Sequence, residues 1–281
     1  YVKIKGVTKG VCKEMLKYSI PMMPSIILWW VINVSDRYMV TYFIGSAANG
    51  LYTAASKIPN FIIMFSSIFI DAWQLSAVDE YDNDGKGRFF TNVFRVYSGG
   101  VFAAASGLIV FCQLITKILV SSSYYDSWQY VPILIISTTL SCFVNFLASV
   151  YMASKKTIMG MVTAFAGAIT NVVLNLILIP RMGPSGAAVA TVTAFIVVFI
   201  TRAIDTKKYV NINFSTPAMV TEVVILAAQA AVMIFMQSGI AMYAIELALL
   251  VVMLVFNYKP IKELVVLLAD KFLKKGRKNK S

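Results

Sequence analysis

Long apolar stretches recur along this chain and constrain its fold more than any other feature. Each is about 20 residues long, the length at which an α-helix crosses the hydrocarbon core of a bilayer. We outline eight of them, at residues 18–44, 50–76, 93–119, 130–152, 158–179, 184–204, 218–237 and 240–257. The sequence therefore predicts an all-α fold, a polytopic membrane helix bundle of about eight transmembrane helices.

The distribution of charge supports this topology. Only 14% of the residues are charged, against about 25% in soluble domains. The net charge of +12 could indicate nucleic acid or anionic lipid as a partner. However, 21 of the 25 Lys and Arg residues fall in the two ends and in every second connector. The positive-inside rule then predicts that both ends are cytoplasmic, and no nucleic-acid partner is expected.

The same pattern divides the chain into four regions. We expect a basic cytoplasmic leader, a six-span bundle, two additional spans, and an amphipathic and basic cytoplasmic tail that lies on membrane lipids. Their bounds are 1–17, 18–204, 205–257 and 258–281. Because the first residue is tyrosine rather than methionine, we also expect that an N-terminal part precedes this sequence.

Residue usage argues against catalysis. The chain has no histidine and three cysteines without metal-ligand spacing, so a zinc site or a common general base is hard to build. The connectors on the outer side are short. We expect no catalytic residue, no metal and no cofactor, and a protein that is not an enzyme.

A charged pair lies inside the first apolar stretch. Each charge at membrane depth costs about 2.5–3.5 kcal/mol, so Asp36 and Arg37 indicate a buried polar passage. Arg37 suits an anionic substrate because its planar guanidinium matches phosphate oxygens. Asn33 lies one helical turn away and could orient the pair. Asp36 is either a coupling acid or the ion-pair partner of Lys57 in the next stretch, and Lys57 is a further candidate substrate contact.

Other polar residues within the spans have two interpretations each. Asp71 is a second candidate cavity or coupling acid, or an acid that simply reaches the interface. Asn171 and Asn175 are four residues apart and share a helix face. They hydrogen-bond neighbouring helices or face a sugar.

Two prolines lie near the start of the first span. Pro21 and Pro24 each lack the backbone N–H that a continuous helix would use. A bend at this point is expected, and a hinge for conformational change is the hypothesis that follows.

Two short stretches resemble each other. Gly45-SAAN-Gly50-LYTAA and Gly183-PS-Gly186-AAVAT each join an outward-going span to an inward-going one through glycines and continue with small residues. Small residues allow helices to pack closely in lipid. Close packing is the simplest interpretation of these glycines and alanines, with substrate contact as the alternative.

These motifs carry a family resemblance. The prolines, SDRYMVTYFIG, GLYTAASKI and NVVLNLILIPRMGPSGAAVATVTAF follow in that order. Together they resemble the C-terminal half of Wzx-like polysaccharide flippases, the O-antigen and capsule repeat-unit transporters. These belong to the exporter superfamily that also holds MATE drug exporters and the lipid II flippase. The resemblance covers most of residues 14–205 and implies the second of two six-span bundles that face each other across a cavity. The N-terminal bundle is then an expected partner.

The resemblance also implies a function. The substrate would be a polyprenyl-pyrophosphate-linked oligosaccharide, moved across the bacterial inner membrane by alternating access. Arg37, Asn33 and Lys57 would contact it, and Asp36 and Asp71 would couple its movement to an ion. One alternative is a MATE-like exporter of cationic drugs, which needs acids in the cavity. Another is a membrane-embedded glycosyltransferase or polymerase, which generally needs a sizeable external loop.

Overall fold

The computed structural model describes residues 9–20 and 22–262, and all regular structure in these ranges is helical. The helices are α1 (Lys9–Ser19), α2 (Met22–Phe43), α3 (Ser46–Ala55), α4 (Asn60–Asp79), α5 (Lys86–Val110), α6 (Cys112–Leu119), the 3₁₀ helix η2 (Ser122–Gln129), α7 (Val131–Ala153), α8 (Thr157–Met182), α9 (Pro184–Thr206), α10 (Thr216–Phe235) and α11 (Ile240–Phe256). The all-α prediction is confirmed.

The helices have the length and composition of membrane spans. Six of the described helices, α4, α5, α7, α8, α9 and α10, are long and apolar enough to cross a membrane. Helix α11 is equally apolar but shorter, at 17 residues. Helix α2 has 22 residues and carries the charged pair of the first predicted span. The chain is therefore a multi-pass membrane protein, in agreement with the prediction of about eight spans.

Two predicted spans are broken rather than continuous. The stretch 50–76 is divided between α3 and α4, with a turn at residues 56–59. Pro59 explains this break, because its ring lacks an N–H and clashes with the carbonyl four residues earlier. The stretch 93–119 breaks at Phe111, between α5 and α6. No proline lies there.

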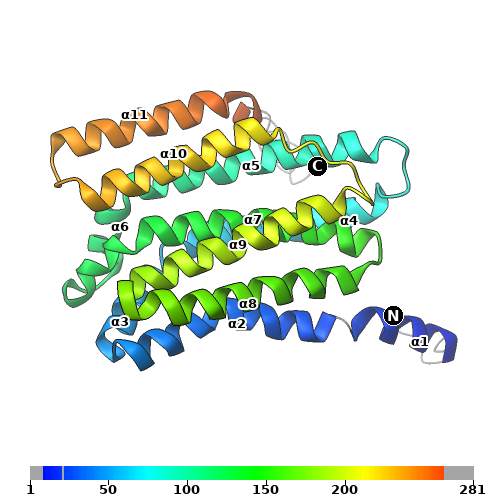
Figure 1. Cartoon of the computed structure of the whole chain (residues 1–281). Coiled ribbons are helices and arrows are strands. Elements are labelled where there is room, and N and C mark those ends of the chain that lie inside the picture. The colour runs from blue at the N-terminus through cyan, green and yellow to red at the C-terminus, as the bar shows by residue number, and fades with distance from the viewer. Residues whose placement is uncertain (1–8, 21, 263–281) are drawn as a thin grey trace, which may run out of the picture.

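Helix α7 forms the centre of the bundle. It carries no charged residue, and most of its side chains are buried. This is expected for a helix that is apolar on all sides. It packs against α4, α5, α9 and α10, while α2 packs on α8 and α9. In Figure 1, α10 and α11 lie beside α5 at the top of the view, and α2 and α8 lie at the bottom. The extra helix pair is thus separated from α2 by the body of the bundle.

The glycine connectors have specific backbone roles. Gly45 and Gly183 adopt φ angles of 120° and 62° at the helix junctions, a region that disfavours residues with a side chain. A Cβ added at Gly186 would lie 2.4 Å from the carbonyl oxygen of Leu178, so α9 approaches the backbone of α8 closely there. The structure thus supports the packing interpretation for Gly186.

The helix is interrupted at the start of the first span, where the prolines predict a bend. Helix α1 ends at Ser19 and α2 begins at Met22. Pro24 lies in the first turn of α2, where backbone N–H groups lack an intrahelical partner anyway, so it does not break a longer helix. Pro21 and most of the predicted amphipathic tail, residues 263–281, lie outside the described residues.

Candidate functional site

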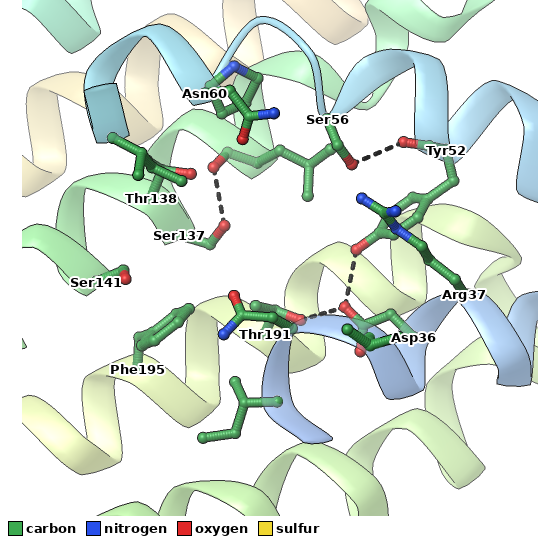
Figure 2. A pocket seen from close by; sticks show the side chains of 16 residues that line it. Asp36, Arg37, Tyr52, Ser56, Asn60, Ser137, Thr138, Ser141, Thr191 and Phe195 are labelled. Carbon is green, nitrogen blue, oxygen red and sulfur yellow. Dashed lines mark hydrogen bonds between the residues drawn. The ribbon is translucent and has the colours of Figure 1, made fainter. Parts of the chain in front are cut away.

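The carboxylate of Asp36 is the centre of a polar network that joins four helices. It lies on α2 and is 3% exposed. The hydroxyl groups of Tyr52 and Thr191 donate to Oδ2 over 2.9 and 2.6 Å. The side-chain amides of Asn171 and Asn175 donate to Oδ1 over 3.3 and 2.6 Å. These donors come from α3, α8 and α9, and Figure 2 shows the hydroxyl donors beside the carboxylate.

The partners of the buried Asp36 carboxylate are neutral hydrogen-bond donors. A buried carboxylate is costly unless it is hydrogen-bonded or paired, and here four neutral donors supply the compensation. The predicted ion pair between Asp36 and Lys57 is wrong, because all the hydrogen bonds that the structure gives this carboxylate come from other side chains and Lys57 is exposed. All four hydrogen bonds are donated to the carboxylate, which is the arrangement expected for an ionised acid.

The Thr191 hydroxyl lies between two acceptors of this network. It lies 2.6 Å from Asp36 Oδ2 and 3.0 Å from the backbone carbonyl oxygen of Ala187. A hydroxyl has one proton to donate and two lone pairs that accept. With Asp36 ionised, Thr191 donates to it. With Asp36 protonated, the acid donates to Thr191, which then donates to Ala187. The site therefore accommodates both protonation states without moving heavy atoms.

A pocket of about 270 Å³ lies beside Asp36. Its walls come from α2, the turn between α3 and α4, α7 and α9 (Figure 2). The polar side chains that line it are Asn33, Asp36, Arg37, Tyr52, Ser56, Asn60, Ser137, Thr138, Ser141 and Thr191. An arginine and many hydroxyl and amide groups thus face one cavity inside a bundle of apolar helices.

The predicted site residues are only partly brought together. Arg37 is half-buried and lines the pocket beside Asp36. Asn33 also lines it, is exposed, and donates to the carbonyl oxygen of Trp29 over 2.7 Å. Lys57 is exposed in the turn between α3 and α4, and Asp71 is exposed on α4. Neither of these two is among the residues that line the pocket.

Sequence reasoning missed both hydroxyl donors of the network. Tyr52 lies in GLYTAA and Thr191 in GAAVAT, within the two similar stretches whose small residues suggested packing. Each stretch places one hydroxyl on Asp36 from the helix that follows a glycine connector. Their common position after the glycines was a usable signal. The hydroxyls of α7 gave no such signal, because Ser and Thr residues in an apolar helix commonly bond their own backbone.

A second buried charge lies near the other end of α9. Arg202 lies within α9 and is 1% exposed. Its guanidinium donates to Thr163 Oγ1 over 3.0 Å and to the carbonyl oxygens of Val144 and Gly160 over 2.8 and 3.3 Å. The Trp29 ring centroid lies 5.2 Å away, within range of a cation–π interaction. Arg202 therefore ties α7, α8 and α2 to α9.

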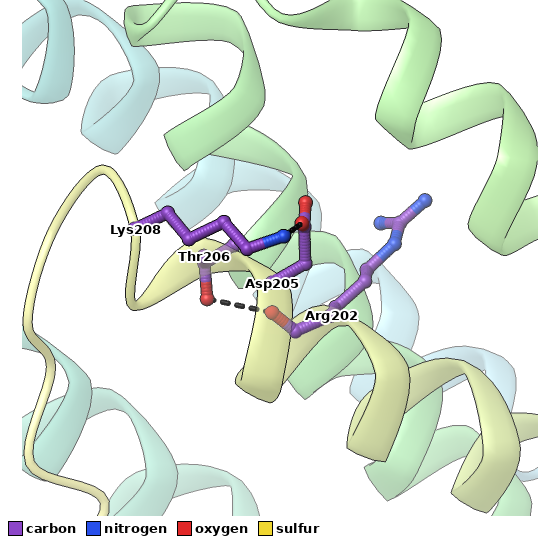
Figure 3. A network of polar contacts seen from close by, with 4 residues as sticks. All are labelled: Arg202, Asp205, Thr206 and Lys208. Carbon is purple, nitrogen blue, oxygen red and sulfur yellow. Dashed lines mark hydrogen bonds and ion pairs between the residues drawn. The ribbon is translucent and has the colours of Figure 1, made fainter.

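A buried acid and an exposed lysine near the end of α9 pair with each other. The carboxylate of Asp205 accepts an ion-pair hydrogen bond from Lys208 over 2.9 Å, and this bond raises the pKa of the Lys208 ammonium. Figure 3 shows that the Arg202 side chain points away from both. The two positive charges thus have separate roles, one inside the bundle and one at its surface.

Two solved structures share this fold. The lipid II flippase MurJ, in an inward closed conformation, matches with a TM-score of 0.61 at 15% identity over 94% of this chain and 57% of its own. A MOP superfamily transporter from Pyrococcus furiosus matches with a TM-score of 0.55 at 16% identity over 91% of this chain and 66% of its own. No curated protein sequence matches the chain.

These findings give the fold and one family match. The chain shares the fold of the lipid II flippase MurJ and of the MOP superfamily transporter. Residues 2–129 match the family described as polysaccharide biosynthesis protein. This match covers under half of the chain, and together with the shared fold it agrees with the resemblance to polysaccharide flippases described above. The chain spans under two thirds of the length of either solved transporter.

Proposed function

We propose that this chain belongs to a transporter that flips a polyprenyl-pyrophosphate-linked oligosaccharide repeat unit across the membrane by alternating access. The observation that carries the proposal is the polar pocket, in which Arg37 lies beside the Asp36 network within a flippase-like bundle. The family match of residues 2–129 supports polysaccharide biosynthesis as the setting.

The pocket suits the head group of such a substrate. Arg37 supplies a planar cation for a pyrophosphate oxygen. Asn33 and the hydroxyls of Ser137, Thr138 and Ser141 supply donors and acceptors for sugar hydroxyls. The prenyl chain is apolar and can stay in lipid beside the bundle. Lys57, exposed at the α3–α4 turn, is a peripheral contact that meets the anion as it enters or leaves.

Asp36 is the coupling acid in this proposal. Its hydrogen-bond network accommodates a proton through reversal of the Thr191 hydroxyl. When Asp36 is ionised, α3, α8 and α9 all donate to one carboxylate on α2. Protonation weakens those charge-assisted bonds and so loosens α2 from its neighbours. Asp71, exposed on α4, is a secondary candidate that acts in the same cavity only when another bundle faces α4.

The boundary between α1 and α2 is the proposed hinge. The two helices end and begin on either side of residues 20–21, next to Pro21 and Pro24 in the sequence. A change of angle there moves α1 relative to α2. Replacement of both prolines by alanine slows transport at matched expression; unchanged transport contradicts the hinge.

The orientation follows from charge at the ends of the bundle. The α4–α5, α7–α8 and α9–α10 connectors lie at one end (Figure 1). Arg88, Lys155, Lys156, Lys207 and Lys208 lie in or beside these connectors. We place this end and both termini of the segment in the cytoplasm of a bacterium, with the bundle in its inner membrane. A preceding six-span bundle, facing α2 and α4, completes the transporter.

The alternative of a MATE-like exporter of cationic drugs rests on Asp36. An acid in the pocket would attract a cation, but its two oxygens already receive four hydrogen bonds. The half-buried Arg37 beside it repels a cationic ligand. The anionic substrate is therefore the better fit.

The test compares Arg37→Ala with Arg37→Lys in the intact transporter. At matched protein levels in the membrane, the alanine variant loses surface polysaccharide, and the lysine variant keeps part of it because it retains the charge. Normal surface polysaccharide in the alanine variant removes Arg37 from the site. Tighter binding of hydrophobic cations than of polyprenyl-linked sugars favours the drug exporter.

A further inference from the structure

A fully buried acid lies in the extra helix pair, on helices that do not line the Asp36 pocket. Glu246 on α11 and Gln229 on α10 are both 0% exposed. The Gln229 amide nitrogen donates to Glu246 Oε2 over 3.2 Å. Glu246 Oε1 and the amide oxygen of Gln229, Oε1, are both buried without a hydrogen-bond partner in the part of the chain that the structure describes. The pair therefore contains two orphaned acceptors and no donor for either.

Within the described residues, α6, α10 and α11 supply no ion-pair partner for an ionised Glu246. It is the only charged residue of α11, and the acid of α10, Glu222, lies seven residues from Gln229, or about 10 Å along the helix. On α6, the buried thiol of Cys112 lies within electrostatic range and Lys117 is exposed. Tyr243 on α11 donates its hydroxyl to Gln113 instead. Among the described residues, no Lys or Arg forms an ion pair with Glu246.

The contrast with Asp36 is informative. Both acids are buried among apolar helices, but Asp36 receives four hydrogen bonds and Glu246 receives one. An ion buried in a protein costs several kcal/mol unless hydrogen bonds and a partner compensate. That compensation exists at Asp36 and is absent at Glu246.

A single proton on Glu246 provides a hydrogen bond for both unpaired oxygens. A protonated Glu246 has an O–H donor on Oε1 and an acceptor on Oε2. The O–H can then donate to Gln229 Oε1 while the Gln229 amide continues to donate to Oε2. We propose that Glu246 holds a proton and forms a neutral acid–amide pair with Gln229. The helix pair α10–α11 thus carries a proton-binding site of its own.

This site joins α11 to the rest of the chain. Helix α11 packs against α10 and α5, and Figure 1 shows it at the margin of the bundle. In an apolar setting, a doubly hydrogen-bonded neutral pair holds two helices together, whereas a carboxylate with one donor favours water over the helix interface. Loss of the proton therefore weakens the attachment of α11 to α10.

Infrared spectroscopy of the full chain in lipid nanodiscs tests the proposal directly. A protonated carboxylic acid has a C=O stretch distinct from that of a carboxylate. We expect this band at neutral pH, its loss in Glu246→Gln, and its retention in the control Glu222→Gln, which removes the acid at the other end of the pair. A spectrum without the band, or a band that Glu246→Gln leaves unchanged, overturns the proposal.

Stability against pH is the second measurement. The native state holds a proton that the unfolded chain releases, so the wild type loses stability as pH rises above the ordinary range of a glutamate carboxyl, about 4. Glu246→Gln forms an amide–amide pair with the same two hydrogen bonds, and we expect it to fold normally and to lose this pH dependence. Gln229→Leu removes the acceptor and lowers stability. If Glu246→Gln fails to fold, or if added sodium stabilises the wild type in place of a proton, Glu246 carries a charge and the proposal is wrong.

Discussion

Removal of the Thr191 hydroxyl is the sharpest test of the Asp36 network. Thr191→Val keeps the shape of the side chain but deletes the bond of 2.6 Å to Asp36 Oδ2. It also deletes the acceptor of the Asn171 amide, 3.1 Å away. A hydrogen bond to a charged group contributes about 1.5–3 kcal/mol, and a neutral bond between membrane helices contributes about 0.6 kcal/mol. We therefore expect Thr191→Val to lower the free energy of unfolding by about 2–3 kcal/mol.

The same helix offers a matched control. Thr193 lies two residues further along α9, is partly buried, and its hydroxyl bonds only the carbonyl oxygen of Val189 in its own helix, over 2.9 Å. Thr193→Val makes the same chemical change without touching the network, so we expect an effect within about 0.5 kcal/mol. Reversible unfolding in mixed micelles measures both variants. Equal losses of stability in the two variants would refute the reasoning, because the bond to Asp36 would then contribute no more than the bond of Thr193 within its own helix.

The remaining predictions address function, packing and the second buried charge. Asp36→Asn removes the titratable group, so we expect transport by the intact protein to stop responding to external pH at matched expression; a preserved pH response would exclude Asp36 as the coupling acid. Gly186→Ala places a Cβ 2.4 Å from a backbone oxygen and should cost about 1–3 kcal/mol of stability by overpacking. Gly107→Ala meets open space and should be neutral or stabilise by up to about 1 kcal/mol; similar unfolding midpoints would contradict this. Arg202→Lys should destabilise the chain more than Arg202→Met, because an ammonium cannot make the three hydrogen bonds of the guanidinium and remains a buried charge; the opposite order in unfolding free energies would show that charge alone matters.

The site shows where sequence reasoning succeeds and where it stops. Asp36 and Arg37 stood out because charge inside an apolar helix is costly and needs a reason. Their partners did not stand out, since Tyr52 and Thr191 are ordinary in apolar helices. Asn171 and Asn175 were recognised as one polar face, but two interpretations remained for them. The structure shows that they bond Asp36 on α2, across 139 positions of sequence in the case of Asn175.

Some expectations failed for local physical reasons. The second span was expected to be continuous because hydropathy does not register a single Pro59, which breaks the helix through sterics. Arg202 lies near the end of α9, where basic residues usually reach the membrane surface, but it is buried. Its burial depends on carbonyl groups of α7 and α8 that close contact with α9 brings within reach.

The sequence by itself determined the class of this protein. Apolar stretches of membrane-spanning length and basic residues in alternate connectors follow from the thickness and electrostatics of a bilayer, and both can be counted along a chain. Only the tertiary structure decided which polar groups meet. It gave Asp36 four donors and Glu246 one, although both are single acids in apolar helices. The physical reason is that the state of a buried acid depends on donors from neighbouring helices, and helix packing, rather than the local sequence, places them.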